Sequence, residues 1–161
     1  MSDPFVTKNI LKWYDLNKRS LPWRKNVSKE KRQYNTLISE FMLQQTQVAT
    51  VIPYFNKFVK EIPNIKKLAS VDNKKLIKLW EGLGYYSRAR NLKKAAQSVI
   101  KNFNGVIPDN FDDLKSLSGI GDYTANAILA IAFNKPYIPL DGNVERAVSY
   151  THLTLPTTHD V

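Results

Sequence analysis

The spacing of apolar residues predicts helices along nearly the whole chain. Alternating runs rich in Val, Ile and Thr, which are typical of strands, are hard to find. The expected helices cover about residues 4–18, 36–52 with an interruption, 71–84, 85–105, 111–119 and 122–133. For the polar, basic stretch 26–35 we expect a loop. The pattern therefore predicts an all-α fold, a single helical bundle without internal repeats.

The stretch 36–52 interrupts its own apolar stripe. Leu37, Phe41 and Val48 follow helical spacing, but Gln44 occupies the position between them. Thr46 is a candidate cap for a new helix, which would put Gln44 and Gln45 in a sharp connection. Pro53 then belongs to the first turn of that helix or kinks it.

Composition limits the classes of function. The chain of 161 residues has the size and the 43% hydrophobic content of one globular domain. No apolar run approaches the roughly 20 residues of a membrane span, and the N-terminus lacks the apolar core of a signal peptide. We therefore expect a cytoplasmic protein with no membrane partner. Because there is no cysteine, disulfides, thiolate metal sites and iron–sulfur clusters are excluded for this chain.

The formal net charge of +10 is spread along the chain instead of forming a tail. Such a charge favours nucleic acid as the partner. A lysine-rich surface that only keeps the protein in solution explains the charge equally well.

The most specific local pattern is LKSLSGIGDYTANAI, residues 114–128. Glycines at 119 and 121 allow a tight turn and a close approach to a ligand, and the helix that follows offers unpaired N–H groups to an anion. This is typical of a helix-hairpin-helix, which holds a DNA phosphate without reading bases. The alternative is an ordinary helical hairpin whose glycine only caps a helix.

Five motifs, in the order LPWR, SEFMLQQTQV, WEGLGYYSRARNL, LSGIGDYTANAI and LDGNVERAV, resemble the helix-hairpin-helix base-excision glycosylases, most closely the MutY-type adenine DNA glycosylases. The resemblance covers about residues 5–147. It implies hydrolysis of the N-glycosidic bond of adenine mispaired with 8-oxoguanine in double-stranded DNA. That chemistry needs a protonated carboxyl that protonates the purine and an ionised carboxylate beside the sugar.

The resemblance also implies a role for particular residues. Glu40 matches the general acid and Asp141 the sugar-side carboxylate, although Glu40 taken alone would be a solvated helix residue. The other implied catalytic residues are Tyr123 and Asn143. The implied DNA-binding residues, which include a wedge that fills the space of the extruded base, are Leu43, Gln44, Gln45, Tyr85, Gly119, Gly121 and Thr124. Those at the adenine pocket are Trp23 and Arg24; taken alone, the PWR segment is a loop with a buried indole.

Three local features leave alternatives open. Tyr123 stands where relatives resembling endonuclease III carry a lysine that forms a Schiff base, and since a phenol cannot do so we expect a monofunctional glycosylase. By itself YIPLDGNVERAV predicts a hairpin with an Asp-Gly turn, whereas the resemblance puts Asp141 at the start of a helix. For Tyr86 a place in the core is favoured over a DNA contact. The competing functions are an endonuclease III-type pyrimidine-damage glycosylase and a non-catalytic helix-hairpin-helix DNA-binding module.

The last residues depart from the family pattern. Relatives continue past the DGNV motif with further helices, commonly a loop with a 4Fe–4S cluster, and a domain that recognises 8-oxoguanine. We therefore expect residues 1–147 to be a partial catalytic region without a cofactor, and 148–161 to be a foreign or frameshifted tail whose histidines are incidental. We also expect a monomer in which the apolar face of the first helix is uncovered and excision is impaired.

Overall fold

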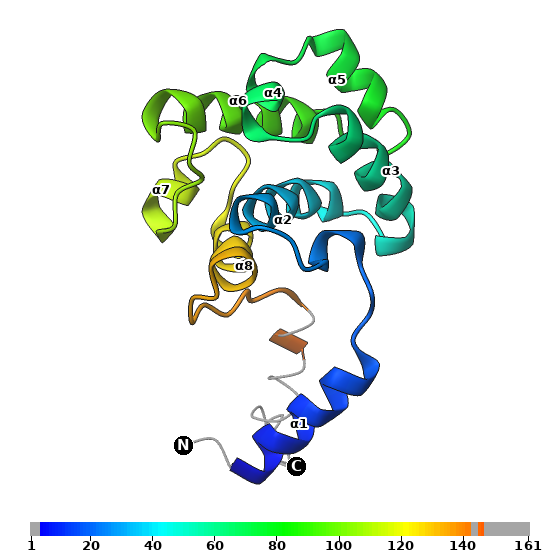
Figure 1. Cartoon of the computed structure of the whole chain (residues 1–161), viewed down its shortest axis with the longest axis vertical. Coiled ribbons are helices and arrows are strands. Elements are labelled where there is room, and N and C mark those ends of the chain that lie inside the picture. The colour runs from blue at the N-terminus through cyan, green and yellow to red at the C-terminus, as the bar shows by residue number, and fades with distance from the viewer. Residues whose placement is uncertain (1–3, 143–144, 147–161) are drawn as a thin grey trace, which may run out of the picture.

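A computed structural model describes residues 4–142, 145 and 146, and these contain helices but no strand. The prediction of an all-α fold is confirmed. In chain order the elements of Figure 1 are α1 (Pro4–Asn17), the 3₁₀ helix η1 (Pro22–Arg24), α2 (Lys29–Leu43), α3 (Val48–Glu61), α4 (Ile65–Ser70), α5 (Asn73–Trp80), α6 (Ser87–Asn102), α7 (Phe111–Lys115) and α8 (Asp122–Phe133).

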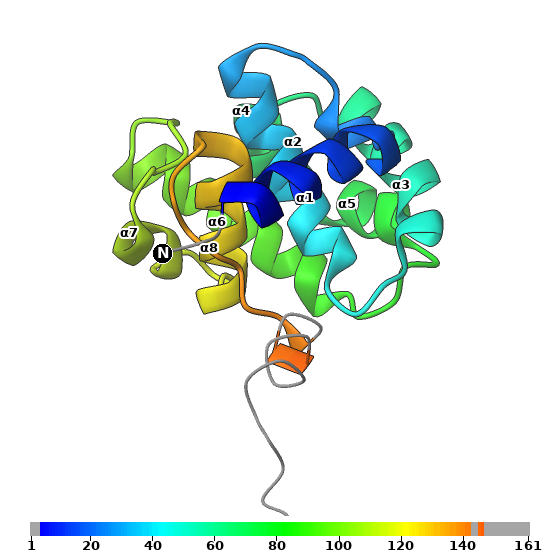
Figure 2. The ribbon, with the colours of Figure 1, turned by 90° about the horizontal axis from the view of Figure 1, so that it is seen from below.

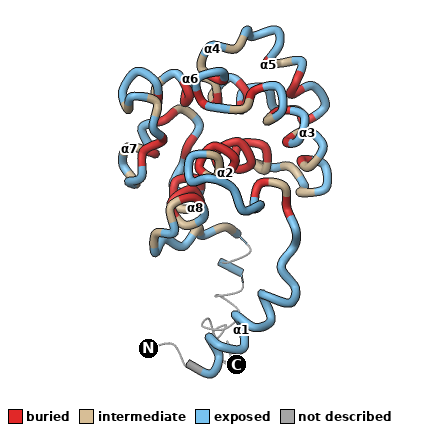
Figure 3. Tube along the Cα trace, viewed as in Figure 1, coloured by how far each residue is buried: buried red, intermediate tan, exposed pale blue. Residues whose placement is uncertain are grey.

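Helix α2 is the centre of the fold. It packs against α8 on one side and against α3 and α6 on the other, so it lies between two layers of helices (Figure 1). Buried residues concentrate along α2 and α8 (Figure 3), and every α2 residue from position 33 to 42 is buried. A helix in this place buries its polar residues together with its apolar ones. The burial of Glu40 follows from that position.

The expectation of a loop at residues 26–35 is wrong, because α2 begins at Lys29. The Ser28 side chain accepts a hydrogen bond from the backbone N–H of Lys31 at 3.3 Å, as a helix cap does. The Tyr34 hydroxyl then donates to the Ile62 carbonyl at 2.5 Å and ties the helix to the end of α3. Charged residues with straight side chains are good helix formers, so the polarity of this stretch was a poor sign of a loop.

Helix ends elsewhere follow local signals. The Asp72 carboxylate accepts from the N–H groups of Lys74 and Lys75 at 2.8 and 3.1 Å and so caps the start of α5. Beyond α6, Gly105 has a φ of +80° and donates its N–H to the Val99 carbonyl at 3.0 Å, which closes the helix. Pro53 lies inside α3, and α4 lies outside the helices expected from the sequence.

Helix α1 lies apart from the rest. Figure 1 shows it below the other helices at the end of an extended segment, and Figure 2, seen from below, shows it in front of them. Phe5, Ile10, Trp13 and Leu16 are all exposed, so the expected exposure of its apolar face is confirmed. In the part of the chain that is described, no helix has both the length and the apolar character that crossing a membrane requires.

Candidate active site

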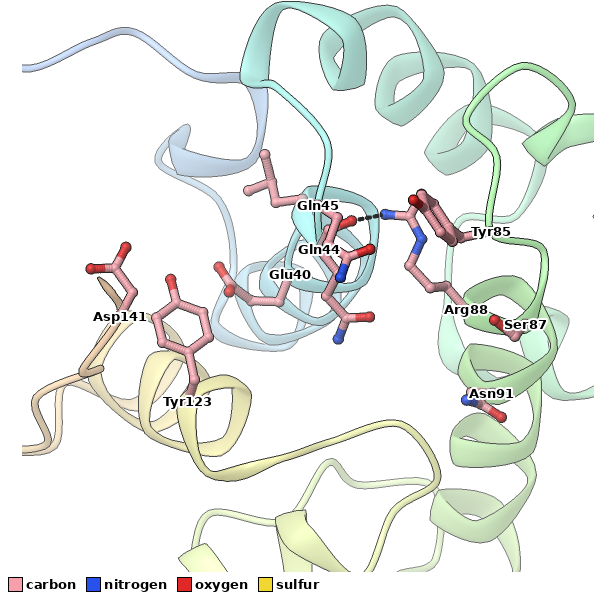
Figure 4. A pocket seen from close by; sticks show the side chains of 10 residues that line it. Glu40, Gln44, Gln45, Tyr85, Ser87, Arg88, Asn91, Tyr123 and Asp141 are labelled. Atoms are coloured by element: carbon pink, nitrogen blue, oxygen red, sulfur yellow. Dashed lines mark hydrogen bonds between the residues drawn. The ribbon is translucent and has the colours of Figure 1, made fainter. Parts of the chain in front are cut away.

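A cavity of about 610 Å³ opens where α2, α6 and α8 meet (Figure 4). Most of the residues expected at the catalytic site and in the wedge converge there, from segments far apart in sequence. The described residues that line it are Glu40, Leu43, Gln44, Gln45, Tyr85, Ser87, Arg88, Asn91, Tyr123 and Asp141.

The Glu40 carboxyl is almost fully buried in the wall of this cavity, with 8% of the residue exposed. Burial disfavours the charged form and raises its pKa to about 7, while the positive charge of Arg24 acts in the opposite direction. The solvated alternative for Glu40 is therefore wrong. Near neutral pH this carboxyl holds a proton in a large fraction of molecules and can donate it to a bound group.

Tyr123 lies beside both carboxylates. Figure 4 shows the side chains of Asp141, Tyr123 and Glu40 next to one another. The pKa of the Tyr123 phenol is raised by burial first, and then by the charges on Glu40 and Asp141. The phenol is thus neutral at physiological pH and able to donate a hydrogen bond to a carboxylate.

Asp141 starts a helical turn. Its backbone carbonyl accepts the N–H of Glu145 at 2.9 Å, the i to i−4 bond of an α-helix. Gly142, Glu145 and Arg146 are helical, so the start of a helix that the resemblance implies at Asp141 is confirmed and the alternative of a hairpin is not. Asn143 lies outside the described residues.

The connection between α2 and α3 is as sharp as expected. Gln44 caps the C-terminus of α2, and Gln45 has a left-handed backbone with a φ of 56°. The Gln44 side chain donates to the Gly119 carbonyl at 3.3 Å, which ties the connection to the hairpin before α8. Thr46 is not the cap, because α3 starts after Gln47 and the Thr46 hydroxyl instead donates to the Gln44 carbonyl at 3.4 Å.

The segment between α5 and α6 brings an aromatic ring to the cavity. Tyr85 is exposed and has a φ of 48°, another left-handed residue that is not glycine. Tyr86, expected in the core, is 37% exposed and forms the N-cap of α6, so that expectation is wrong. Both rings are therefore accessible at the surface.

The two hairpin glycines have different surroundings. Gly119 has a φ of +83°, and a Cβ there would lie 2.8 Å from the Asn91 Cβ and 2.9 Å from the Phe41 ring. Around the Cβ position of Gly121, the N-cap of α8, no described atom outside its own neighbours lies within 4 Å. Gly119 is therefore needed for internal packing, and Gly121 leaves the open space that a phosphate requires.

The first turn of α8 offers backbone donors rather than side chains. The first N–H groups of a helix have no acceptor within it. The Thr124 side chain is buried, so its expected contact with DNA is restricted to the backbone. Asp122, at the first position, is exposed and forms an ion pair with Lys115 at 2.6 Å.

The two residues expected at the adenine pocket, Trp23 and Arg24, lie in different surroundings. Trp23 is buried in the core, where its ring meets Phe55 edge to face at 5.3 Å, and it does not line the cavity. The core location is the alternative that the sequence left open for the PWR segment. Arg24 is exposed and reaches the site only through the effect of its charge on Glu40.

Arg88 is the residue that the sequence did not reveal. Its guanidinium is buried and donates hydrogen bonds to backbone carbonyls of α2 and of the segment before α6. In the sequence it is one of many basic residues. The available signal was its spacing from Leu92, Ala96 and Val99, which puts it on the buried face of α6.

The cofactor implied for relatives does not fit this chain. A four-cysteine 4Fe–4S cluster needs thiolates, and the sequence contains no cysteine. Over the described residues no group of three His, Cys, Asp or Glu side chains is placed to hold a metal ion.

The chain is similar in sequence to one family of known proteins. Residues 38–160 match the family described as "HhH-GPD superfamily base excision DNA repair protein". The adenine DNA glycosylase of Buchnera aphidicola subsp. Acyrthosiphon pisum is 47% identical over 147 residues, which are 91% of this chain and 41% of the relative. That of Rattus norvegicus is 45% identical over 146 residues, 88% of this chain and 28% of the relative. The chain thus spans less than half the length of these relatives.

Solved structures show the same fold. A thermostable thymine-DNA glycosylase superposes with a TM-score of 0.80 at 26% identity, over 92% of this chain and 70% of the other. An endonuclease III in a non-covalent complex with DNA gives 0.72 at 23% identity, over 92% and 68% of the two chains. The second likeness concerns the fold alone.

Proposed function

Because this chain belongs to the HhH-GPD superfamily of base-excision DNA repair proteins, we propose that it is the catalytic region of a DNA glycosylase that hydrolyses the N-glycosidic bond of adenine mispaired with 8-oxoguanine. The observation that carries the proposal is the meeting of Glu40, Tyr123 and Asp141 in one cavity, with the Glu40 pKa at about 7. The identity of 45–47% to adenine DNA glycosylases supports adenine as the base.

The two carboxyl groups divide the chemistry. Protonated Glu40 donates its proton to a ring nitrogen of the adenine while the bond between the sugar and the base breaks, and the electron pair of that bond leaves with the base. The sugar is left with the positive charge of an oxocarbenium ion. The Asp141 carboxylate stabilises this charge until water adds to the sugar and releases a proton.

Tyr123 makes the enzyme monofunctional. Its neutral phenol donates a hydrogen bond to the Asp141 carboxylate or to the sugar and cannot form an imine. The product is then an abasic site in an intact strand.

The DNA partner is a duplex containing the mispair. The target base must leave the stack before Glu40 can reach it, and Leu43, Gln45 and Tyr85 border the cavity where they can fill the vacated space. The N-terminus of α8, beside the open position of Gly121, holds a phosphate through backbone N–H groups. We propose that the protein acts as a monomer on DNA in the cytoplasm.

A single-turnover excision assay on a duplex with adenine opposite 8-oxoguanine tests the function. Glu40→Gln and Asp141→Asn should each lower the rate by about 10²- to 10⁴-fold, the usual contribution of such groups. Glu61→Gln is the matched control, since Glu61 is an exposed glutamate of α3 paired with Lys75. Two results contradict the proposal. One is DNA binding without excision both by this chain and by a chimera that carries the C-terminal region of the Buchnera relative, which is expected of a non-catalytic module. The other is a borohydride-trapped adduct on oxidised pyrimidines, which is expected of an endonuclease III-type enzyme.

The expected impairment of this chain needs a second comparison. A chimera extended by the C-terminal region of the Buchnera relative should excise adenine faster than the chain alone. Equal rates would contradict the impairment and leave the reaction itself in place.

A further inference from the structure

Two turns beside the cavity hold their backbones in an unusual conformation. Gln45 and Tyr85 have φ values of 56° and 48°, in the left-handed region that residues with a Cβ seldom occupy. Such conformations persist where the surroundings hold them, and they are concentrated at functional sites. The two residues belong to different connections, one between α2 and α3 and the other between α5 and α6.

One guanidinium holds both turns. Arg88 donates from Nη1 to the Gln44 carbonyl, the contact dashed in Figure 4, and from Nη2 to the Gly84 carbonyl at 3.2 Å. These carbonyls belong to the peptides that directly precede Gln45 and Tyr85. Each bond therefore fixes the peptide plane on which the left-handed φ depends.

Further contacts fix the guanidinium itself. It packs near the rings of Trp80 and Tyr85, with centroid distances of 5.7 and 5.6 Å. Its other acceptors are the carbonyls of Phe41, Met42 and Leu83, at 3.3, 2.9 and 3.1 Å, and the Thr46 hydroxyl at 3.1 Å. Arg88 is only 7% exposed and forms no ion pair with a carboxylate among the described residues.

Burying a cation without a counter-ion costs desolvation free energy, and a helix can be capped without that cost. The planar fork of an arginine donates to the two backbone segments from two separate nitrogens, whereas all the donors of a lysine lie on one nitrogen. This geometry indicates that the joining of the two turns, and not the capping of α2 alone, is what Arg88 provides.

We propose that Arg88 is a positioning residue that locks the Gln45 and Tyr85 turns into one preformed wedge for base extrusion. The inference rests on the proposed function, because it assigns Gln45 and Tyr85 to the space that the target base leaves. A preformed wedge needs no ordering while the base is being extruded, so the protein captures the extruded base more readily.

The decisive variant is Arg88→Met, which keeps an unbranched apolar stem and removes the guanidinium with its donors and its charge. On adenine opposite 8-oxoguanine its single-turnover rate at saturating enzyme should fall about 10- to 100-fold, as expected for misplaced groups. On a duplex in which adenine faces an abasic-site analogue, the adenine has no base pair to break before it is extruded. The rate of the variant should therefore fall less than about threefold on this duplex. General structural damage would lower both rates by the same factor and would overturn the inference.

A fluorescent base separates extrusion from chemistry. With 2-aminopurine in place of the target adenine, the wild-type chain should raise its fluorescence on binding, and Arg88→Met should lose at least half of that rise while it still binds the duplex. A full rise in the variant would refute the positioning role. If the wild type extrudes the base but excises no adenine, the proposed function fails and the Arg88 inference stands; if it does neither, both fail.

Two further variants serve as controls. Arg90→Met removes the same charge from an exposed position of α6 and should keep both the rate and the fluorescence rise. Arg88→Lys keeps the buried charge but reaches one turn only, and decides the question if Arg88→Met does not fold. Its rate and fluorescence should lie between wild type and zero, and wild-type behaviour would contradict the need for a fork.

Discussion

Replacing Glu40 with glutamine should make the protein more stable at alkaline pH while it lowers the excision rate by about 10²- to 10⁴-fold. The Glu40 pKa is about 7 in the folded protein, against an ordinary value of 4.5 that applies to the unfolded chain. Between these values the folded protein keeps a proton that the unfolded chain releases. The free energy of unfolding therefore falls as the pH rises, and the stabilisation is lost as the pH passes through the folded pKa.

The size of this effect follows from the two pKa values. At about 1.4 kcal/mol per unit of pKa, Glu40 should remove roughly 2.5 kcal/mol of stability between pH 5 and pH 8. Glutamine has nearly the same shape and no charge, so the variant lacks this loss. The difference in unfolding free energy between Glu40→Gln and wild type should grow by about 2.5 kcal/mol over that range, with the variant gaining as the pH rises.

Urea denaturation at several pH values from 5 to 8 measures this difference. Contributions of other titrating groups cancel, because both proteins contain them. Glu61→Gln is the control: the hydrogen bond and charge of Lys75 lower the pKa of Glu61, so it stays ionised throughout and its difference should be flat. If the difference in unfolding free energy between Glu40→Gln and wild type also stays constant with pH, the claim that a buried, proton-holding carboxyl lines the cavity is refuted.

Other expectations concern catalysis, the hairpin and the core. Excision by the wild type should fall about tenfold per pH unit above pH 7 as Glu40 loses its proton, and a pH-independent rate would exclude it as the donor. Gly121→Ala should weaken duplex binding in a gel-shift titration without lowering the melting temperature, whereas Gly119→Ala should cost more than about 1 kcal/mol of stability; the reverse order would contradict the hairpin assignment. Asp122→Asn should bind duplex DNA more tightly at low salt, with the gain lost at high salt, and unchanged affinity would mean that no phosphate lies near. Trp23→Ala should lower the unfolding free energy, measured in urea, by about 3–5 kcal/mol. A small loss would contradict the core position of the indole and favour its expected place in the substrate pocket.

Local signals made several parts of the fold predictable. The all-helical class follows from apolar spacing, and the ends of α5 and α6 follow from Asp72 and Gly105, because caps depend on atoms a few residues away. The same holds for the glycine hairpin before α8. The motifs that resemble glycosylases also singled out Glu40, Tyr123 and Asp141, which the fold brings to one cavity.

The local pattern was ambiguous in two places, because it allows two structures. A charged segment can be a loop or a helix; the predicted loop was wrong, and packing of Tyr34 against the end of α3 selects the helix. An Asp-Gly pair can form a hairpin turn or begin a helix; the helix start implied by the resemblance was right, and the bond from Glu145 to Asp141 selects it. Propensity alone does not separate such cases, since the contacts that decide them come from elsewhere in the chain or from the next turn.

By itself the sequence determined which residues carry acid, amide and aromatic groups, and where helices are able to start and stop. Only the tertiary structure decided their environment. The Glu40 carboxyl has a raised pKa because α2 is enclosed by other helices, and the Arg88 guanidinium joins two distant turns because the carbonyls of both lie beside it. Burial and convergence depend on residues dozens of positions apart, whereas a sequence pattern reports the few neighbours of each residue.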